Sequence, residues 1–219
     1  MNKIIIALAL LLISSPVFAE SMQHRIDSIG FCILNANKIN KRIIFTYSEP
    51  TKKQFIPKEV TKREIIIYGD TVQYAETDDE VAAMLSQKIS NAEKSYDGQG
   101  RGTIGTLQVL ISPKKYEMVG DKRAVDYMVH AGYNPLGLIT FINKSCPQKK
   151  YDLISKHTLT SKRLGEVYEY ILTKYPYFLQ NNTYIDNIYY QNFLLNSIEN
   201  RKRLEAKINN NSFEKVKYE

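Results

Sequence analysis

Histidine, cysteine and long apolar runs are scarce in this chain of 219 residues, and each shortage excludes a class of protein. The three histidines are His24, His130 and His157, and no two of them lie four residues apart, so no His-x-x-x-His pair is available to bind a metal on one helical face. The two cysteines, Cys32 and Cys146, belong to no Cys-x-x-Cys redox motif, and the sequence leaves open whether they pair.

The main apolar run lies near the N-terminus and is too short to span a membrane. It covers Ile4–Ile13, about half of the roughly 20 residues that a membrane-spanning helix needs. Lys3 precedes the run, and Val17-Phe18-Ala19 follows it with small residues at the cleavage positions, which is typical of a secretory signal. We therefore expect a signal peptide over 1–19 with cleavage after Ala19, a periplasmic or secreted protein, and no stable membrane span after cleavage.

The charge is modestly basic, with 30 Lys and Arg against 23 Asp and Glu. These basic residues are spread over several short groups, and no aromatic-interleaved basic motif accompanies them, so we expect no nucleic-acid binding. The length that remains after signal cleavage fits one domain, or one domain with an appendage, and is sufficient to bury a substantial core.

Hydrophobic periodicity predicts an α+β protein, mainly helical with a small sheet. Thr77 and Glu80 form a capping box that starts a helix reaching about Lys94. Within Gly98–Gly105, the residues Gly100, Gly102 and Gly105 match Gly-x-Gly-x-x-Gly, but the match follows a helix and not a strand, so we expect a flexible loop over Gly98–Gly105. The other expected elements are a helix over Met22–Asn37, strands over Ile43–Tyr47 and Glu64–Tyr68, and helices from Tyr116 to Ala131, from Pro135, from a Ser161 cap and from Asp186, with a disordered end after Ile208.

The order of motifs after residue 116 resembles peptidase family M forty-eight, the HtpX-like, CAAX-prenyl-protease-like and BepA-like zinc metallopeptidases. Glu117-Met-Val-Gly-Asp121 is similar to the ExxxD helix of that family, and Ala131-Gly-Tyr-Asn-Pro135 is similar to the segment that follows it. His157 with Arg163 is similar to a later family segment whose proline is lost. The resemblance covers roughly Ile26–Tyr175. It implies a degenerate zincin-like peptidase domain over 20–175, followed by a helical extension over 176–219.

The HExxH motif of the family is missing. The aligned pentapeptide is Gln87-Lys88-Ile89-Ser90-Asn91, so neutral amides stand at both histidine positions and a cation stands at the general base. Of the three family zinc ligands only Glu117 remains, with Asp121 at the second-shell position; the other catalytic-equivalent positions are His157 and Arg163. We therefore expect no intact catalytic or metal site and no cofactor, although zinc is the cofactor of the family.

The resemblance predicts that Gln87, Lys88 and Asn91 face Glu117, and we expect the Lys88 ammonium to pair with that carboxylate. The leading hypothesis is an exported, non-catalytic relative of a zinc metalloendopeptidase. It would bind a protein or an extended peptide in the cell envelope, with Glu64–Tyr68 accepting the peptide as an added strand.

Two alternatives stay open. The first is an active zinc-dependent endopeptidase with a rebuilt metal site, for example from Glu117, Cys146 and His157. The second is a purely structural role through the amphipathic C-terminal helix.

Overall fold

The computed structural model describes residues 21–49, 63–100, 113–146 and 159–218. This part of the chain is mostly helical with one small sheet, which confirms the predicted α+β class. The signal segment, His157 and the loop glycines Gly102 and Gly105 lie outside the described residues. In chain order the elements are a first helix over 21–36, β1 (Ile44–Ser48), β2 (Glu64–Tyr68), α2 (Gly69–Val72), α3 (Asp78–Gly100), α5 (Pro113–His130), α6 (Leu136–Ser145), α7 (Thr160–Lys174), α8 (Tyr177–Gln180), α9 (Ile188–Asn196) and α10 (Ile198–Asn209).

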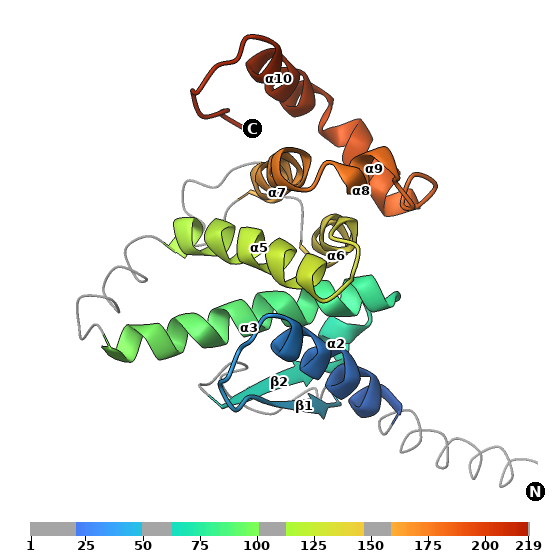
Figure 1. The fold of residues 1–219 in the computed structure, drawn as a ribbon. Coiled ribbons are helices and arrows are strands. Elements are labelled where there is room, and N and C mark those ends of the chain that lie inside the picture. Colours follow the sequence, from blue (N-terminus) through green and yellow to red (C-terminus); the bar gives the residue numbers. More distant parts are fainter. Residues whose placement is uncertain (1–20, 50–62, 101–112, 147–158, 219) are drawn as a thin grey trace, which may run out of the picture.

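The long helix α3 lies at the centre of the arrangement. Figure 1 shows the sheet and the first helix on one side of α3, and α5 and α6 on the other. Helices α7 and α9 pack in turn against α5 and α6, and α10 lies beyond α7. Residues from the two ends of the chain are therefore separated by the layer of α3, α5 and α6.

The sheet consists of β1 and β2 paired in parallel, from Ile44 opposite Glu64 to Ser48 opposite Tyr68. β2 has the predicted bounds, and β1 begins one residue later than predicted. The Ile44 amide donates to the Arg63 carbonyl (2.8 Å). Because backbone groups alternate in direction along a strand, the even-numbered residues of β1 direct their backbone groups toward β2.

The opposite edge of β1 is covered by one side chain of the first helix. The Gln23 amide group donates to the Phe45 carbonyl (2.9 Å) and accepts from the Tyr47 amide (2.6 Å). An exposed strand edge is a template for pairing with another chain. Gln23 provides hydrogen-bond partners for the backbone of this stretch of the β1 edge. The two edges of the sheet are therefore not equivalent.

The start of α3 is the predicted capping box. The Glu80 amide donates to the Thr77 hydroxyl (3.2 Å), and the Thr77 amide donates back to the Glu80 carboxylate (3.3 Å). The loop predicted from Gly98 is wrong for residues 98–100, because α3 continues to Gly100. Glycine lowers helix stability by about 1 kcal/mol per residue. An established helix nevertheless gains one hydrogen bond per added residue, so it extends past weak formers.

The turn between α5 and α6 is the predicted helix stop. Gly132 has φ +83°, the left-handed conformation that glycine adopts without strain. The Tyr133 amide then donates to the Met128 carbonyl (2.9 Å) and the Gly132 amide to the Val129 carbonyl (3.1 Å), which completes a Schellman motif. The Asn134 amide donates to Asp79 (2.8 Å), so this turn is fixed to the first turn of α3.

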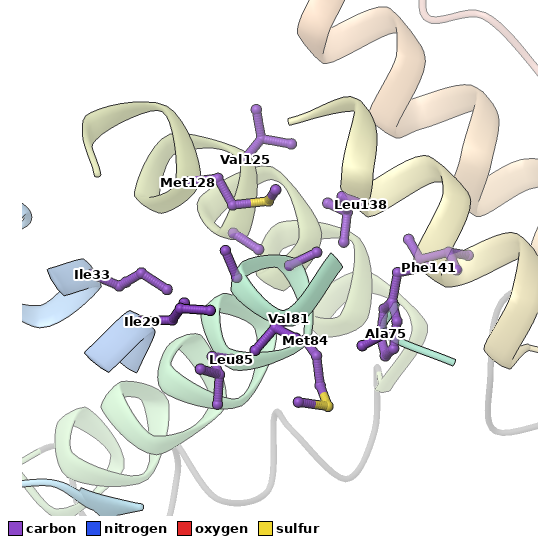
Figure 2. Packing of buried hydrophobic residues seen from close by; sticks show 14 of the residues in the cluster. Ile29, Ile33, Ala75, Val81, Met84, Leu85, Val125, Met128, Leu138 and Phe141 are labelled. Carbon is purple, nitrogen blue, oxygen red and sulfur yellow. The ribbon is translucent and has the colours of Figure 1, made fainter. Parts of the chain in front are cut away.

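The main core surrounds α3. Figure 2 shows Val81, Met84 and Leu85 of α3 between side chains of the first helix and those of α5 and α6. Val81 and Leu85 are fully buried, as is Ile89 one turn further along. The apolar stripe predicted for this helix is therefore the centre of the core, and it fixes the face that α3 turns toward α5.

Two predicted helix starts in the C-terminal part are wrong. Ser161 does not cap α7, because the helix already includes Thr160, which is buried, and its N-cap is Leu159. The single helix expected from Asp186 is two helices, α9 and α10, which meet at Ser197. Asn187 caps α9 by accepting from the Tyr189 and Tyr190 amides (3.0 and 3.1 Å). The apolar pattern continues across Ser197, so periodicity alone does not reveal the break.

Helix α9 and the turn before it share the main core. Tyr184, Tyr190 and Phe193 are buried in the same cluster as the α3 stripe. Past Ile208, where composition predicts disorder, Val216 and Tyr218 are buried. Among the described residues, no helix is both long and apolar enough to cross a membrane.

Candidate functional site

Four of the residues that the family resemblance selected come together where α3, α5 and α7 meet. Gln87 lies on α3, Glu117 and Asp121 lie one turn apart on α5, and Arg163 lies on α7. Cys146, the residue that ends α6, joins them. These five residues are called the Arg163 cluster below. They are far apart in the sequence, so their meeting is a property of the fold.

The strongest contact in the cluster is a two-point ion pair between Arg163 and Asp121. Arg163 Nε lies 2.5 Å from Asp121 Oδ2, and Nη2 lies 2.8 Å from Oδ1. This parallel arrangement is the strong form of an arginine–carboxylate interaction. The Asp121 side chain is only 3% exposed, so solvent does little to weaken the pair. Gln87 Nε2 also donates to Asp121 Oδ1 (2.7 Å), which connects α3 to the same carboxylate.

The third nitrogen of the guanidinium contacts two further groups. Arg163 Nη1 lies 3.3 Å from Glu117 Oε1 and 3.4 Å from Cys146 Sγ. Burial by itself lowers the pKa of Arg163, but the carboxylates, Asp121 first and then Glu117, outweigh it and hold the pKa above its usual value. Arg163 is thus a permanent cation surrounded by the acidic groups of α5.

Of the three side chains predicted to face Glu117, Gln87 contacts Asp121, which lies one turn from Glu117 on α5. Lys88 is almost fully buried, whereas Asn91 is exposed. Arg163 is one cation that lies against Glu117. The pairing of Lys88 with Glu117 stays a prediction.

The cluster does not fit a zinc ion. Zinc sites in proteins use thiolate, imidazole and carboxylate ligands. Here Gln87 offers only a neutral amide, which already donates to Asp121, and the carboxylates of Asp121 and Glu117 both contact Arg163. A divalent ion at this place would have to compete with the guanidinium for those oxygens. In the four described stretches of the chain, no three His, Cys, Asp or Glu side chains group in a way that suits a metal ion.

The sequence did not predict the contacts that Arg163 and Cys146 make. The rebuilt zinc site considered above groups Glu117, Cys146 and His157. Two of these, Glu117 and Cys146, do meet, but at the same nitrogen of Arg163, while His157 lies outside the described residues. Both cysteines are free: Cys32 is exposed, and Cys146 belongs to the cluster.

Comparison of the chain with family models, curated proteins and solved structures gives no match. The function proposed below therefore depends on the geometry of the Arg163 cluster and on the order of residues along the chain.

Proposed function

We propose that this chain is an exported, non-catalytic relative of the family M forty-eight zinc metallopeptidases that binds a protein or an extended peptide in the cell envelope. The observation that carries the proposal is the convergence of Gln87, Asp121 and Arg163. These positions were chosen by their order in the family pattern, and they lie on three different helices. Their contact supports a zincin-like arrangement of α3, α5 and α7.

The chemistry of the cluster supports a binding role over catalysis. Peptide hydrolysis by the family requires a metal-bound water and a carboxylate that takes its proton. The general-base position is Lys88, whose cationic side chain cannot accept a proton. Asp121 and Glu117 both contact the Arg163 guanidinium, so a divalent ion would have to compete with that cation for their oxygens.

The sheet provides a route for peptide binding. The ladder bonds direct the backbone groups of Arg63, Ile65 and Ile67 toward β1, so alternation directs those of Ile66 toward the outer edge of β2. Gln23 already covers part of the β1 edge. An extended peptide that adds a strand to this sheet would therefore pair with β2.

Purified protein is expected to retain zinc well below one ion per chain after dialysis, measured by inductively coupled plasma mass spectrometry. The matched variant carries Gln87→His, Lys88→Glu and Asn91→His, which restores the family motif beside Glu117 and is expected to gain zinc. Stoichiometric zinc in the unaltered protein, with chelator-sensitive cleavage of casein, would instead establish the zinc-dependent endopeptidase.

Strand addition is tested with Ile66→Pro. Proline removes one backbone donor at the outer edge of β2, where a strand tolerates it. Loss of main-chain hydrogen bonds to a peptide is expected to weaken binding about tenfold, since each bond contributes roughly 0.5–1.5 kcal/mol. The measurement is fluorescence anisotropy with fluorescein-labelled casein as the extended probe. Ile66→Val keeps the amide and serves as the control, and equal binding by both variants would exclude the β2 edge as the site.

A further inference from the structure

The segment 212–218 leaves α10 and folds back onto α7. Asn211 has φ +48°, a left-handed conformation that asparagine tolerates. The Ser212 amide donates to the Lys207 carbonyl and the Asn211 amide to the Ile208 carbonyl, both at 3.0 Å, so a Schellman motif reverses the chain at the end of α10. Figure 1 shows the segment curving back from α10 toward α7.

The segment docks by alternate side chains. Val216 and Tyr218 are 8% and 6% exposed, and they pack with Leu204 against Tyr168 and Leu172. Lys215, which precedes Val216, and Lys217, which lies between Val216 and Tyr218, are exposed. This period of two is that of an extended strand with one buried face. The docked segment therefore has a simple pattern of basic and apolar residues in alternation.

The surface beneath the segment matches that pattern in shape and charge. A Cβ atom on Gly165 would lie 2.7 Å from the Tyr218 ring, so the ring can occupy this position only when residue 165 is glycine. The Tyr218 hydroxyl donates to Glu169 (2.8 Å), and the Lys215 ammonium lies 2.9 Å from Glu166. The surface is called the α7–α10 face below and consists of Gly165, Glu166, Tyr168, Glu169, Leu172 and Leu204.

The α7–α10 face carries features of a recognition site. Leu204, Val216 and Tyr218 form a cluster of their own, separate from the main core. Only two side chains of the segment are buried, while the backbone of the whole segment is ordered at an entropic cost. Such weakly held segments open locally before the rest of a fold does. Phe213, at the start of the segment, is fully exposed and adds no contact that would hold it.

We propose that the α7–α10 face is a recognition site for an extended segment in which lysines alternate with an aliphatic residue and a tyrosine. Segment 212–218 fills this face within the chain, and a partner protein that presents the same pattern binds by displacing it. Glu166 selects for the lysine that precedes the aliphatic residue, Glu169 accepts from the tyrosine hydroxyl, and Gly165 admits the ring. The proposal is independent of the function proposed above, because it uses no residue of the Arg163 cluster.

The test uses a fluorescein-labelled synthetic peptide with the sequence of residues 210–219. The chain truncated after Asn211 is expected to bind this peptide at least about tenfold more tightly than the full chain, because the internal segment no longer competes. A second peptide, with serine in place of Val216 and Tyr218, keeps the charges and is expected to bind at least about tenfold more weakly. Gly165→Leu in the truncated chain is expected to abolish binding.

A full-length Tyr218→Ala variant provides the same test if truncation impairs folding, since it loosens the segment without removing it. Circular dichroism and thermal melts establish that each variant is folded. A folded truncated chain that binds no peptide, or binds the serine peptide equally well, would overturn the proposal. A dimer of the full chain that dissociates on truncation would also overturn it, because the occupant would then be the segment of a second copy.

Discussion

Replacing Arg163 by alanine is expected to lower the free energy of unfolding by about 3–5 kcal/mol, the range for removing one partner of a buried ion pair. The substitution leaves the Asp121 carboxylate, whose side chain is 3% exposed, with Gln87 as its remaining described partner in the cluster. It also removes the cation beside Glu117. For a chain of this size the loss corresponds to a decrease in melting temperature of roughly 6–20 °C.

Urea unfolding measures this effect, and two variants serve as references. Lys202→Ala removes a pair with Glu199 whose side chains are 66% and 76% exposed, and it is expected to cost less than about 1 kcal/mol. Arg163→Met combined with Asp121→Leu removes both charges and is expected to be more stable than Arg163→Ala alone. If Arg163→Ala and Lys202→Ala have the same free energy of unfolding, the cluster does not hold the three helices together.

Replacing Lys144 by methionine is expected to lower the free energy of unfolding by about 3 kcal/mol. The Lys144 side chain is 3% exposed, and its ammonium lies 2.9 and 3.0 Å from the two carboxylate oxygens of the fully buried Glu80. It also lies 4.7 Å from the centre of the Tyr189 ring. Without the ammonium, the Glu80 carboxylate keeps the amides of Glu76 and Thr77 as donors but has no cation beside it.

A double-mutant cycle in urea separates this pair from other effects of the substitution. Lys144→Met with Glu80→Gln removes both charges, so its loss is expected to be smaller than the sum of the two single losses. Glu76→Gln alters the other partner of Lys144, whose side chain is 65% exposed, and is expected to cost less than about 1 kcal/mol. Additive single losses would show that Lys144 and Glu80 are not energetically coupled.

The two pairs have different consequences for the proposed function. Lys144 joins α6 to the first turn of α3 and lies outside the Arg163 cluster, so Lys144→Met is expected to leave peptide binding unchanged wherever the protein stays folded. Arg163 joins α7 to Glu117 and Asp121 of α5. Loss of stability in both variants, without gain of zinc in either, agrees with a cluster held by a guanidinium and not by a metal.

The sequence by itself determined the elements whose signals are local. Thr77 and Glu80 are three residues apart, Gly132 ends its own helix, and β2 is a short β-branched run, so each structure follows from contacts within a few residues. The sequence also identified Gln87, Asp121 and Arg163 as residues of one site, because their order resembles a family pattern. The sequence-based predictions failed at Gly98 and Ser161, where the local signals were ambiguous. A helix that has already formed can continue through a residue of low helix propensity such as glycine, and it can begin before a residue that could have capped it.

Only the tertiary structure decided which side chains from distant positions in the sequence contact each other. The two-point pair of Arg163 with Asp121, the thiol of Cys146 beside the same guanidinium and the burial of Lys144 against Glu80 all join residues more than fifteen positions apart. The covering of β1 by Gln23 and the docking of Tyr218 over Gly165 are of the same kind. Composition and periodicity specify which face of an element is apolar. The partner of a buried charge depends on how those faces pack, and the distances between packed elements are set only when the whole core forms.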